Sequence, residues 1–182
     1  QRQESIVNEQ ALREMSAVGL AAAIRDGSTT SRLVVEAHID RLRKVEPALN
    51  AIVEDRYDAA LADADAADKR VEEAGGDAAM LPPLLGVPCT IKESIALEGM
   101  PNCVGAVHRR DVRSTYNAST VQRLIDAGAI PLGVTNISEL TLWIESDNRV
   151  YGRANNAYDD TRTAGGSSGG EGAAVGSGGS PF

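Results

Sequence analysis

The sequence predicts an α/β protein in which helices cover a β-sheet. Two short apolar runs, 84–91 and 130–135, have the length and composition of buried strands. Between them, residues 119–127 have the pattern of a helix, with Ser119 as the expected N-cap and Gly128 as the stop. A helix that passes through a short glycine turn into an apolar strand is typical of layered α/β cores.

The first third of the chain is predicted to be mainly helical. Residues 15–27 form a candidate helix that Ser16 can cap and Gly27 can close. Apolar residues between 33 and 42 recur close to one face of a second helix. We expect Pro47 to end that helix, because proline has no backbone N–H to continue it.

A short strand and a third helix are expected next, at 51–53 and 58–74. The helix carries four aspartates that raise the question of a metal site, namely Asp58, Asp63, Asp65 and Asp68. Helix neighbours lie three or four residues apart, so these carboxylates do not converge on one point. We therefore predict a solvated acidic face and no metal ligand set.

Charge and hydropathy exclude several classes of partner and location. The 182 residues hold 18 Lys plus Arg against 26 Asp plus Glu, a net charge of -8. This acidity argues against nucleic acid and anionic membranes as partners, since both are polyanions. No apolar run approaches the roughly 18 residues of a spanning helix, and no secretory pattern is present. The two cysteines, Cys89 and Cys103, are expected to be free thiols in a reducing cytoplasm.

We expect the chain to be part of a longer polypeptide. It opens at Gln1 and stops at Phe182, directly after a glycine-rich stretch. Its length suits one domain. We interpret 1–182 as the N-terminal part of a single domain, with a mainly helical region at 1–80 and the start of an α/β core at 81–182.

The glycine-rich segment 165–179 has several readings. A flexible linker is the default for such composition. A P-loop is rejected, because no lysine lies between Thr161 and Phe182. A dinucleotide fingerprint should follow a strand, and the preceding residues 159–164 are polar. The remaining reading is a serine hydrolase site, in which glycines let the backbone approach a substrate and hydroxyls carry the chemistry.

A serine site needs a base, and the chain offers two kinds. Its only histidines, His38 and His108, have charged neighbours and are expected at the surface. Lys92 closes the apolar run and would be carried toward the interior by its strand. Burial lowers the pKa of a lysine, which can make it a base near neutral pH. Taken alone, Lys92 is equally compatible with a solvated lysine at a strand end.

Four motifs in order resemble the amidase signature family. They span 84–182 and comprise GVPCTIKE at 86–93, GAIPLGVTN at 128–136, YGRANN at 151–156 and GGSSGG at 165–170. The helical first third suits the same family. Residues 138–152 and Glu171 are most similar to its fatty acid amide hydrolase branch. The resemblance implies a mixed sheet covered by helices, truncated here.

The resemblance also implies a triad of serine, serine and lysine. Lys92 matches the neutral base, and Ser167 matches the bridging serine that relays a proton and follows a cis peptide bond. Gly166 would ease the crowding of that bond. Ser168 is expected to be a supporting hydroxyl, with Gly169 and Gly170 shaping the turn.

The family's nucleophilic serine belongs to a second glycine-serine segment, which should begin after Phe182. Ser177 and Ser180 are interpreted as structural residues. We therefore expect the 182 residues by themselves to be inactive.

The acyl-binding end is suggested by a short apolar stretch. Thr141, Leu142 and Ile144 match positions near the acyl channel of fatty acid amide hydrolases, while ordinary core packing stays open for them. Trp143, the only tryptophan, is a further candidate for the channel or a surface anchor.

The expected activity is hydrolysis of a carboxylic or fatty acid amide to acid plus ammonia or amine. No metal or organic cofactor is implied, and family members often pair as homodimers. One alternative is the amidase subunit of a tRNA-dependent amidotransferase, although Lys92-Glu93-Ser94 departs from its usual Lys-Asp-Asn. The other is a non-catalytic fragment or interaction module.

Overall fold

A computed structural model describes residues 9–182. Six helices and three strands follow one another in the order α1 (Glu9–Glu14), α2 (Ala17–Arg25), α3 (Ser31–Leu49), β1 (Ile52–Asp55), α4 (Tyr57–Ala74), β2 (Pro88–Lys92), α5 (Ser119–Asp126), β3 (Ile130–Thr135) and α6 (Gly169–Gly176). Short 3₁₀ turns lie at Ala78–Met80, Val107–Arg109 and Glu139–Thr141.

The three strands form a mixed sheet in the order β1-β3-β2. The outer strand β1 runs antiparallel to β3, whereas β2 runs parallel to β3. Lys92 at the end of β2 pairs in register with Thr135 at the end of β3. The predicted α/β class with a mixed sheet is confirmed.

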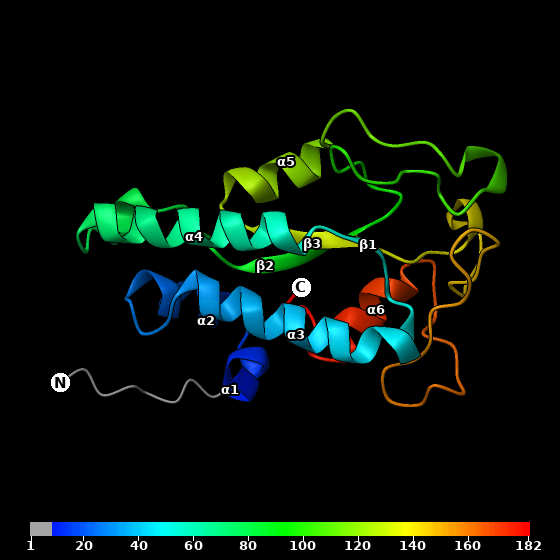
Figure 1. The fold of residues 1–182 in the computed structure, drawn as a ribbon, viewed down its shortest axis with the longest axis horizontal. Coiled ribbons are helices and arrows are strands. Elements are labelled where there is room, and N and C mark those ends of the chain that lie inside the picture. Colours follow the sequence, from blue (N-terminus) through cyan, green and yellow to red (C-terminus); the bar gives the residue numbers. More distant parts are fainter. Residues whose placement is uncertain (1–8) are drawn as a thin grey trace.

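Helices cover the sheet from both sides (Figure 1). On one side, Val121 of α5 packs on Cys89, Ile91 and Val134 of the strands. On the other side, α3 and α6 pack together and against β2. Helix α4 packs against both α3 and β3, and α1 and α2 add a further layer against α3.

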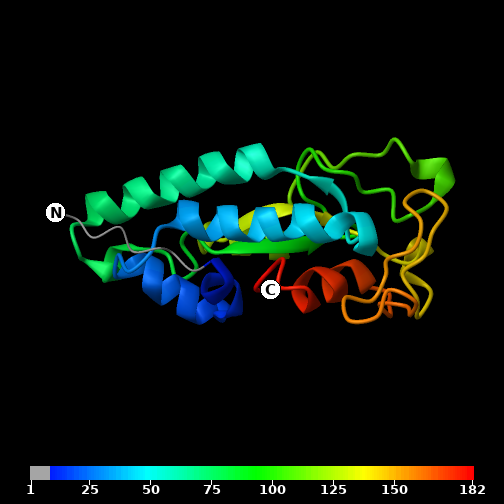
Figure 2. The ribbon, with the colours of Figure 1, turned by 60° about the horizontal axis from the view of Figure 1, so that its bottom comes forward.

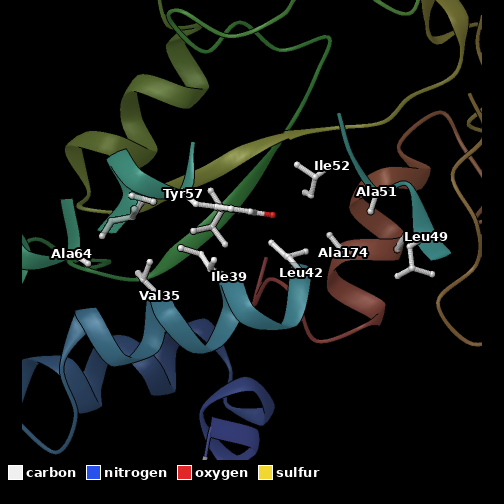
Figure 3. Packing of buried hydrophobic residues seen from close by; sticks show 13 residues of the cluster. Val35, Ile39, Leu42, Leu49, Ala51, Ile52, Tyr57, Ala64 and Ala174 are labelled. Carbon is white, nitrogen blue, oxygen red and sulfur yellow. The ribbon is translucent and has the colours of Figure 1, made fainter. Parts of the chain in front are cut away.

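The largest core cluster joins α3, α4, β3 and α6 (Figure 3). Val35, Ile39 and Leu42 recur on one face of α3 and point into this cluster. Ala174 reaches it from α6. Its burial links the glycine-rich helix to the helical first third of the chain.

The predicted helices of the first third are present, with one correction. The Ser16 side chain accepts from the Gly19 amide and caps α2, as expected. Pro47 does not end α3, which continues to Leu49 with the proline inside. Pro47 lies two residues before the last residue of α3 and removes only one hydrogen-bond donor, and the left-handed Asn50 closes the helix.

Two further boundaries differ from the prediction. The strand expected at 84–91 begins at Pro88, because residues 84–87 form a turn in which the Val87 amide donates to the Leu84 carbonyl. The N-cap of α5 is Ala118, not Ser119, and no side chain caps this helix.

The prediction that His38 lies at the surface is wrong. His38 is 0% exposed, and its Nδ1 donates to the Val34 carbonyl one turn earlier in α3. The charged neighbours in sequence face away, while position 38 falls on the same stripe as Val34 and Leu42, both fully buried. His108 is exposed, as expected.

The aspartates of α4 stabilise helix contacts. The Asp68 carboxylate accepts from the amides of Ser31 and Arg32 and so caps α3 from outside. Asp63 pairs with Arg56, and Asp65 pairs with Arg32. Residues 9–182 contain no group of side chains that could hold a metal ion.

Both long connections, 93–118 and 136–168, gather at one end of the molecule (Figures 1 and 2). This is the end at which the parallel strands β2 and β3 finish, the usual place for sites in α/β sheets. Among residues 9–182 no helix combines the length and apolarity required to cross a bilayer.

Candidate active site

Lys92 lies at the carboxyl end of β2 and points toward the glycine-serine loop. Its Nζ lies 2.7 Å from Ser167 Oγ, although the two residues are 75 positions apart. Burial lowers the pKa of the Lys92 ammonium, and the nearby Glu171 carboxylate opposes this shift. Lys92 is therefore not a fully solvated lysine at a strand end, because its amine is half-buried and bonded to a hydroxyl.

The loop that carries Ser167 has a fixed backbone. The peptide bond between Gly166 and Ser167 is cis, as the family resemblance implied. The Ser167 carbonyl accepts from the Ser138 amide at 3.3 Å. Ser146 holds the loop on both sides of the cis bond, because its amide donates to the Gly165 carbonyl and its Oγ accepts from the Gly169 amide.

Helix α6 begins immediately after this loop, so Gly169 and Gly170 start a helix where a turn was expected. A Cβ at Gly169 would lie 2.5 Å from Ser146 Oγ. A Cβ at Gly170 would lie 2.6 Å from the carbonyl oxygens of Ala51 and Asn136. The glycines let α6 dock directly on the backbone at the end of β3.

Asn136, the residue after β3, organises the backbone around this docking site. Its side-chain amide donates to the carbonyls of Asn50 and Gly152. Its Oδ1 accepts from the Asn148 side chain, which in turn accepts from the Tyr151 amide. These buried bonds join β3 to the segment 148–152.

A buried carboxylate, Glu93, holds the loop that follows β2. It accepts from the Cys103 amide at 2.6 Å, from the Val104 amide and from the Tyr151 hydroxyl at 2.9 Å. Burial raises the pKa of the Cys103 thiol, and burial likewise raises the pKa of Tyr151. Glu93 was noted in sequence only as part of a motif, since its partners lie far along the chain.

A second carboxylate, that of Glu171, lies half-buried on α6. Thr90 Oγ1 donates to it at 2.5 Å and Thr135 Oγ1 donates at 2.9 Å. Burial raises the pKa of Glu171, while the two hydroxyls and the charge of Lys92 lower it. The sequence marked Glu171 as a family feature without indicating its neighbours.

The expected acyl-binding residues lie on an apolar loop beside Ser167. Leu142, Trp143 and Ile144 are 77%, 64% and 75% exposed, so none of them packs into the core that residues 9–182 form. Thr141 belongs to the 3₁₀ turn, and its amide donates to the Ser138 carbonyl. Ser138 also bonds to Ser167, which places this loop next to the glycine-serine loop.

The structure thus brings Lys92, Gly166 and Ser167 together with the loop of Thr141 and Leu142. Ser168 is exposed and its side chain does not cap α6, so its supporting role stays a prediction. The role of Ser146 was missed, because a serine 21 positions before Ser167 carries no sequence signal. Chemically, a half-buried amine in contact with a hydroxyl can exchange a proton with it.

Comparisons with known proteins agree with this geometry. The profile of the amidase family matches residues 33–182. Fatty-acid amide hydrolase 2-A of Danio rerio is 53% identical over 167 residues, covering 90% of this chain and 31% of that protein. A glutamyl-tRNA(Gln) amidotransferase subunit from Chloroflexus aurantiacus is more distant, 36% identical over 167 residues that cover 92% of this chain and 34% of that protein.

A solved structure of a fatty acid amide hydrolase has the same arrangement of elements. It superimposes with a TM-score of 0.90 at 28% identity, covering 97% of this chain and 31% of that one. The chain spans about a third of the length of the relatives that it matches. The family match over most of the sequence, together with the shared fold, shows that this chain belongs to the amidase signature family.

Proposed function

We propose that the full-length protein hydrolyses the C–N bond of a carboxylic or fatty acid amide, with Lys92 as the base and Ser167 as the proton relay. The observation that carries this proposal is the 2.7 Å contact between Lys92 Nζ and Ser167 Oγ. The lowered pKa of Lys92 favours a neutral amine that can accept a proton.

In this mechanism Ser167 gives its proton to Lys92 and takes one from a nucleophilic serine outside the 182 residues. The nucleophile attacks the amide carbon, and the proton then passes back through Ser167 to the departing nitrogen, which leaves as ammonia or an amine. Water hydrolyses the acyl-enzyme with the same base, and the free acid is released.

The exposed apolar loop favours a fatty acyl chain as the substrate. Leu142, Trp143 and Ile144 present apolar side chains beside the reacting groups, a surface that a long acyl chain can bury. The fatty-acid amide hydrolase 2-A of Danio rerio, to which the chain is 53% identical, supports the same substrate class. Nothing at the site favours the amidotransferase or the non-catalytic alternative.

The unpaired thiols of Cys89 and Cys103 support a cytoplasmic location.

Substitution of the base tests the proposal. Lys92→Ala should lower kcat/KM for amide hydrolysis about 100-fold or more in the full-length protein, because it removes a general base. Lys69→Ala, at an exposed lysine of α4, is the matched control and should retain full activity. Unchanged hydrolysis by Lys92→Ala would refute the mechanism.

A fluorophosphonate probe separates the two serine roles. Mass spectrometry should find the adduct on a serine outside residues 1–182. An adduct on Ser167 would contradict the relay assignment and make Ser167 the nucleophile.

A further inference from the structure

The proposed hydrolysis uses Lys92 and Ser167 but assigns nothing to Glu171, a half-buried carboxylate of the same region. Glu171 lies four residues after Ser167, in the first turn of α6. The glycine-serine loop and α6 therefore bring the Ser167 hydroxyl and the Glu171 carboxylate to the same part of the sheet. A half-buried carboxylate needs hydrogen-bond partners, because burial penalises its ionised form.

The partners of Glu171 come from both strands that lead to Lys92. Thr90 precedes Lys92 by two residues on β2, so both side chains lie on the same face of the sheet. Thr135 is the register partner of Lys92 on β3. Because Thr90 and Thr135 each donate to Glu171, its carboxylate lies over the strand ends that carry Lys92.

The hydrogen bonds favour the charged form of Glu171. Each carboxylate oxygen accepts from a different hydroxyl, Oε2 from Thr90 and Oε1 from Thr135. An ionised carboxylate accepts only, and two hydroxyl donors satisfy it on both oxygens. The two hydroxyls thus oppose the effect of burial on Glu171 and hold its carboxylate at a fixed place over the strand ends.

We propose that Glu171 is a positioning residue for Lys92, whose carboxylate, held by Thr90 and Thr135, sets how readily the lysine gives up its proton. This inference rests on the proposed role of Lys92 as the base. Burial by itself lowers the pKa of Lys92 and so favours the neutral amine. The carboxylate opposes that effect and so fixes the pH at which the base becomes available.

Other ionisable groups around this pair do not replace Glu171. Cys89 of β2 points to the α5 side of the sheet, and burial raises the pKa of its thiol to about 12, so it stays neutral. The Glu93 carboxylate turns to the Cys103 and Val104 amides and the Tyr151 hydroxyl. From α3, which packs on α6, Arg41 donates to the Ser177 carbonyl at the other end of the helix.

The test is the pH profile of kcat/KM for amide hydrolysis by the full-length protein. Glu171→Gln keeps the shape of the side chain and removes its charge. The acid limb should then move to lower pH by about one unit, because the Glu171 charge raises the pKa of Lys92 and a nearby opposite charge shifts a pKa by about 1–3 units. Glu98→Gln makes the same change at an exposed carboxylate and should leave the midpoint in place.

A second pair of variants, Thr90→Val and Thr90→Ser, tests the same inference if Glu171→Gln fails to fold. Thr90→Val removes one donor to the carboxylate and should move the acid limb in the same direction by a smaller amount. Thr90→Ser keeps the hydroxyl and should restore the wild-type midpoint. A purely structural role of Thr90 or Glu171 would lower the rate at every pH without moving the midpoint.

The outcomes separate this inference from the amidase proposal. If the midpoint of the acid limb does not move in Glu171→Gln or in Thr90→Val, and Lys92→Ala is inactive, the role of Glu171 is overturned. The assignment of Lys92 as the base then stays intact. Full activity of Lys92→Ala overturns both. A shift of the acid limb to lower pH in Glu171→Gln, with loss of activity in Lys92→Ala, supports both.

Discussion

Replacement of Gly170 by alanine tests whether the close approach of α6 to the sheet is required. In the structure the Gly170 amide donates to the Asn136 carbonyl at 2.9 Å. An added methyl group would lie 2.6 Å from the carbonyl oxygens of Ala51 and Asn136 and would also collide with the Asn136 amide nitrogen. All three atoms belong to the backbone, so no side-chain rotation can relieve the clash.

The expected magnitude follows from two opposing effects. Overpacking of a filled core costs typically about 1–3 kcal/mol, and the upper end applies where the neighbours are backbone atoms. Alanine in a helix gains about 1 kcal/mol over glycine. The net loss for Gly170→Ala should therefore be about 2 kcal/mol or more.

Gly172→Ala provides a matched control within the same helix. The nearest atom to its added methyl group is the Ala164 carbonyl oxygen at 3.6 Å, an ordinary contact. This variant should gain about 0.5–1 kcal/mol through helix propensity and the lower entropy of the unfolded chain. The two substitutions are chemically identical and should have opposite signs.

Urea unfolding followed by circular dichroism measures both variants, with the midpoint lower for Gly170→Ala and higher for Gly172→Ala. Activity should fall with Gly170→Ala, because displacement of α6 moves the preceding Ser167 away from Lys92. If Gly170→Ala were as stable as wild type, the argument that glycine is needed for this contact would be refuted.

Two further predictions concern titration and substrate choice. Burial lowers the pKa of His38, so as the pH falls below about 6.5 the unfolded chain takes up a proton before the folded chain does. The free energy of unfolding should therefore decrease by up to about 1.4 kcal/mol per pH unit in that range. In urea unfolding at several pH values, His38→Gln should reduce this slope, whereas His108→Gln at an exposed position should leave it unchanged. Leu142→Ser should lower kcat/KM for a long-chain amide about tenfold and leave kcat/KM for a short-chain amide unchanged. Val18→Ser, at an equally exposed position on α2, should change kcat/KM for neither substrate. Equal losses on both substrates in Leu142→Ser would argue against an acyl-binding role.

Local patterns predicted the elements because each depends on residues close together in the chain. The cap at Ser16, the buried strand 130–135 and the stops at glycines follow from side-chain periodicity and backbone preference. Boundaries were less certain where two local preferences compete. At Pro47 the loss of one donor near a helix end costs less than the packing of the last turn, so the helix continues.

Single side chains were mispredicted where tertiary packing decides their surroundings. His38 was assigned to the surface from charged neighbours in sequence, but the helix turns it into the core with Val34 and Leu42. The contacts that decide its burial come from residues distant in the chain. For Leu142 and Ile144 the sequence left an acyl channel and core packing open, and both side chains are exposed on residues 9–182.

By itself the sequence determined the α/β class, most helices and the motif order that links Lys92 to Ser167. These features are encoded in local pattern and in the ordered motifs. Only the tertiary structure decided the sheet order, the contact between Lys92 and Ser167 across 75 positions, and the enclosure of Glu171 by Thr90 and Thr135. Such contacts depend on how β2, β3 and α6 pack, and no local preference of the chain specifies that packing.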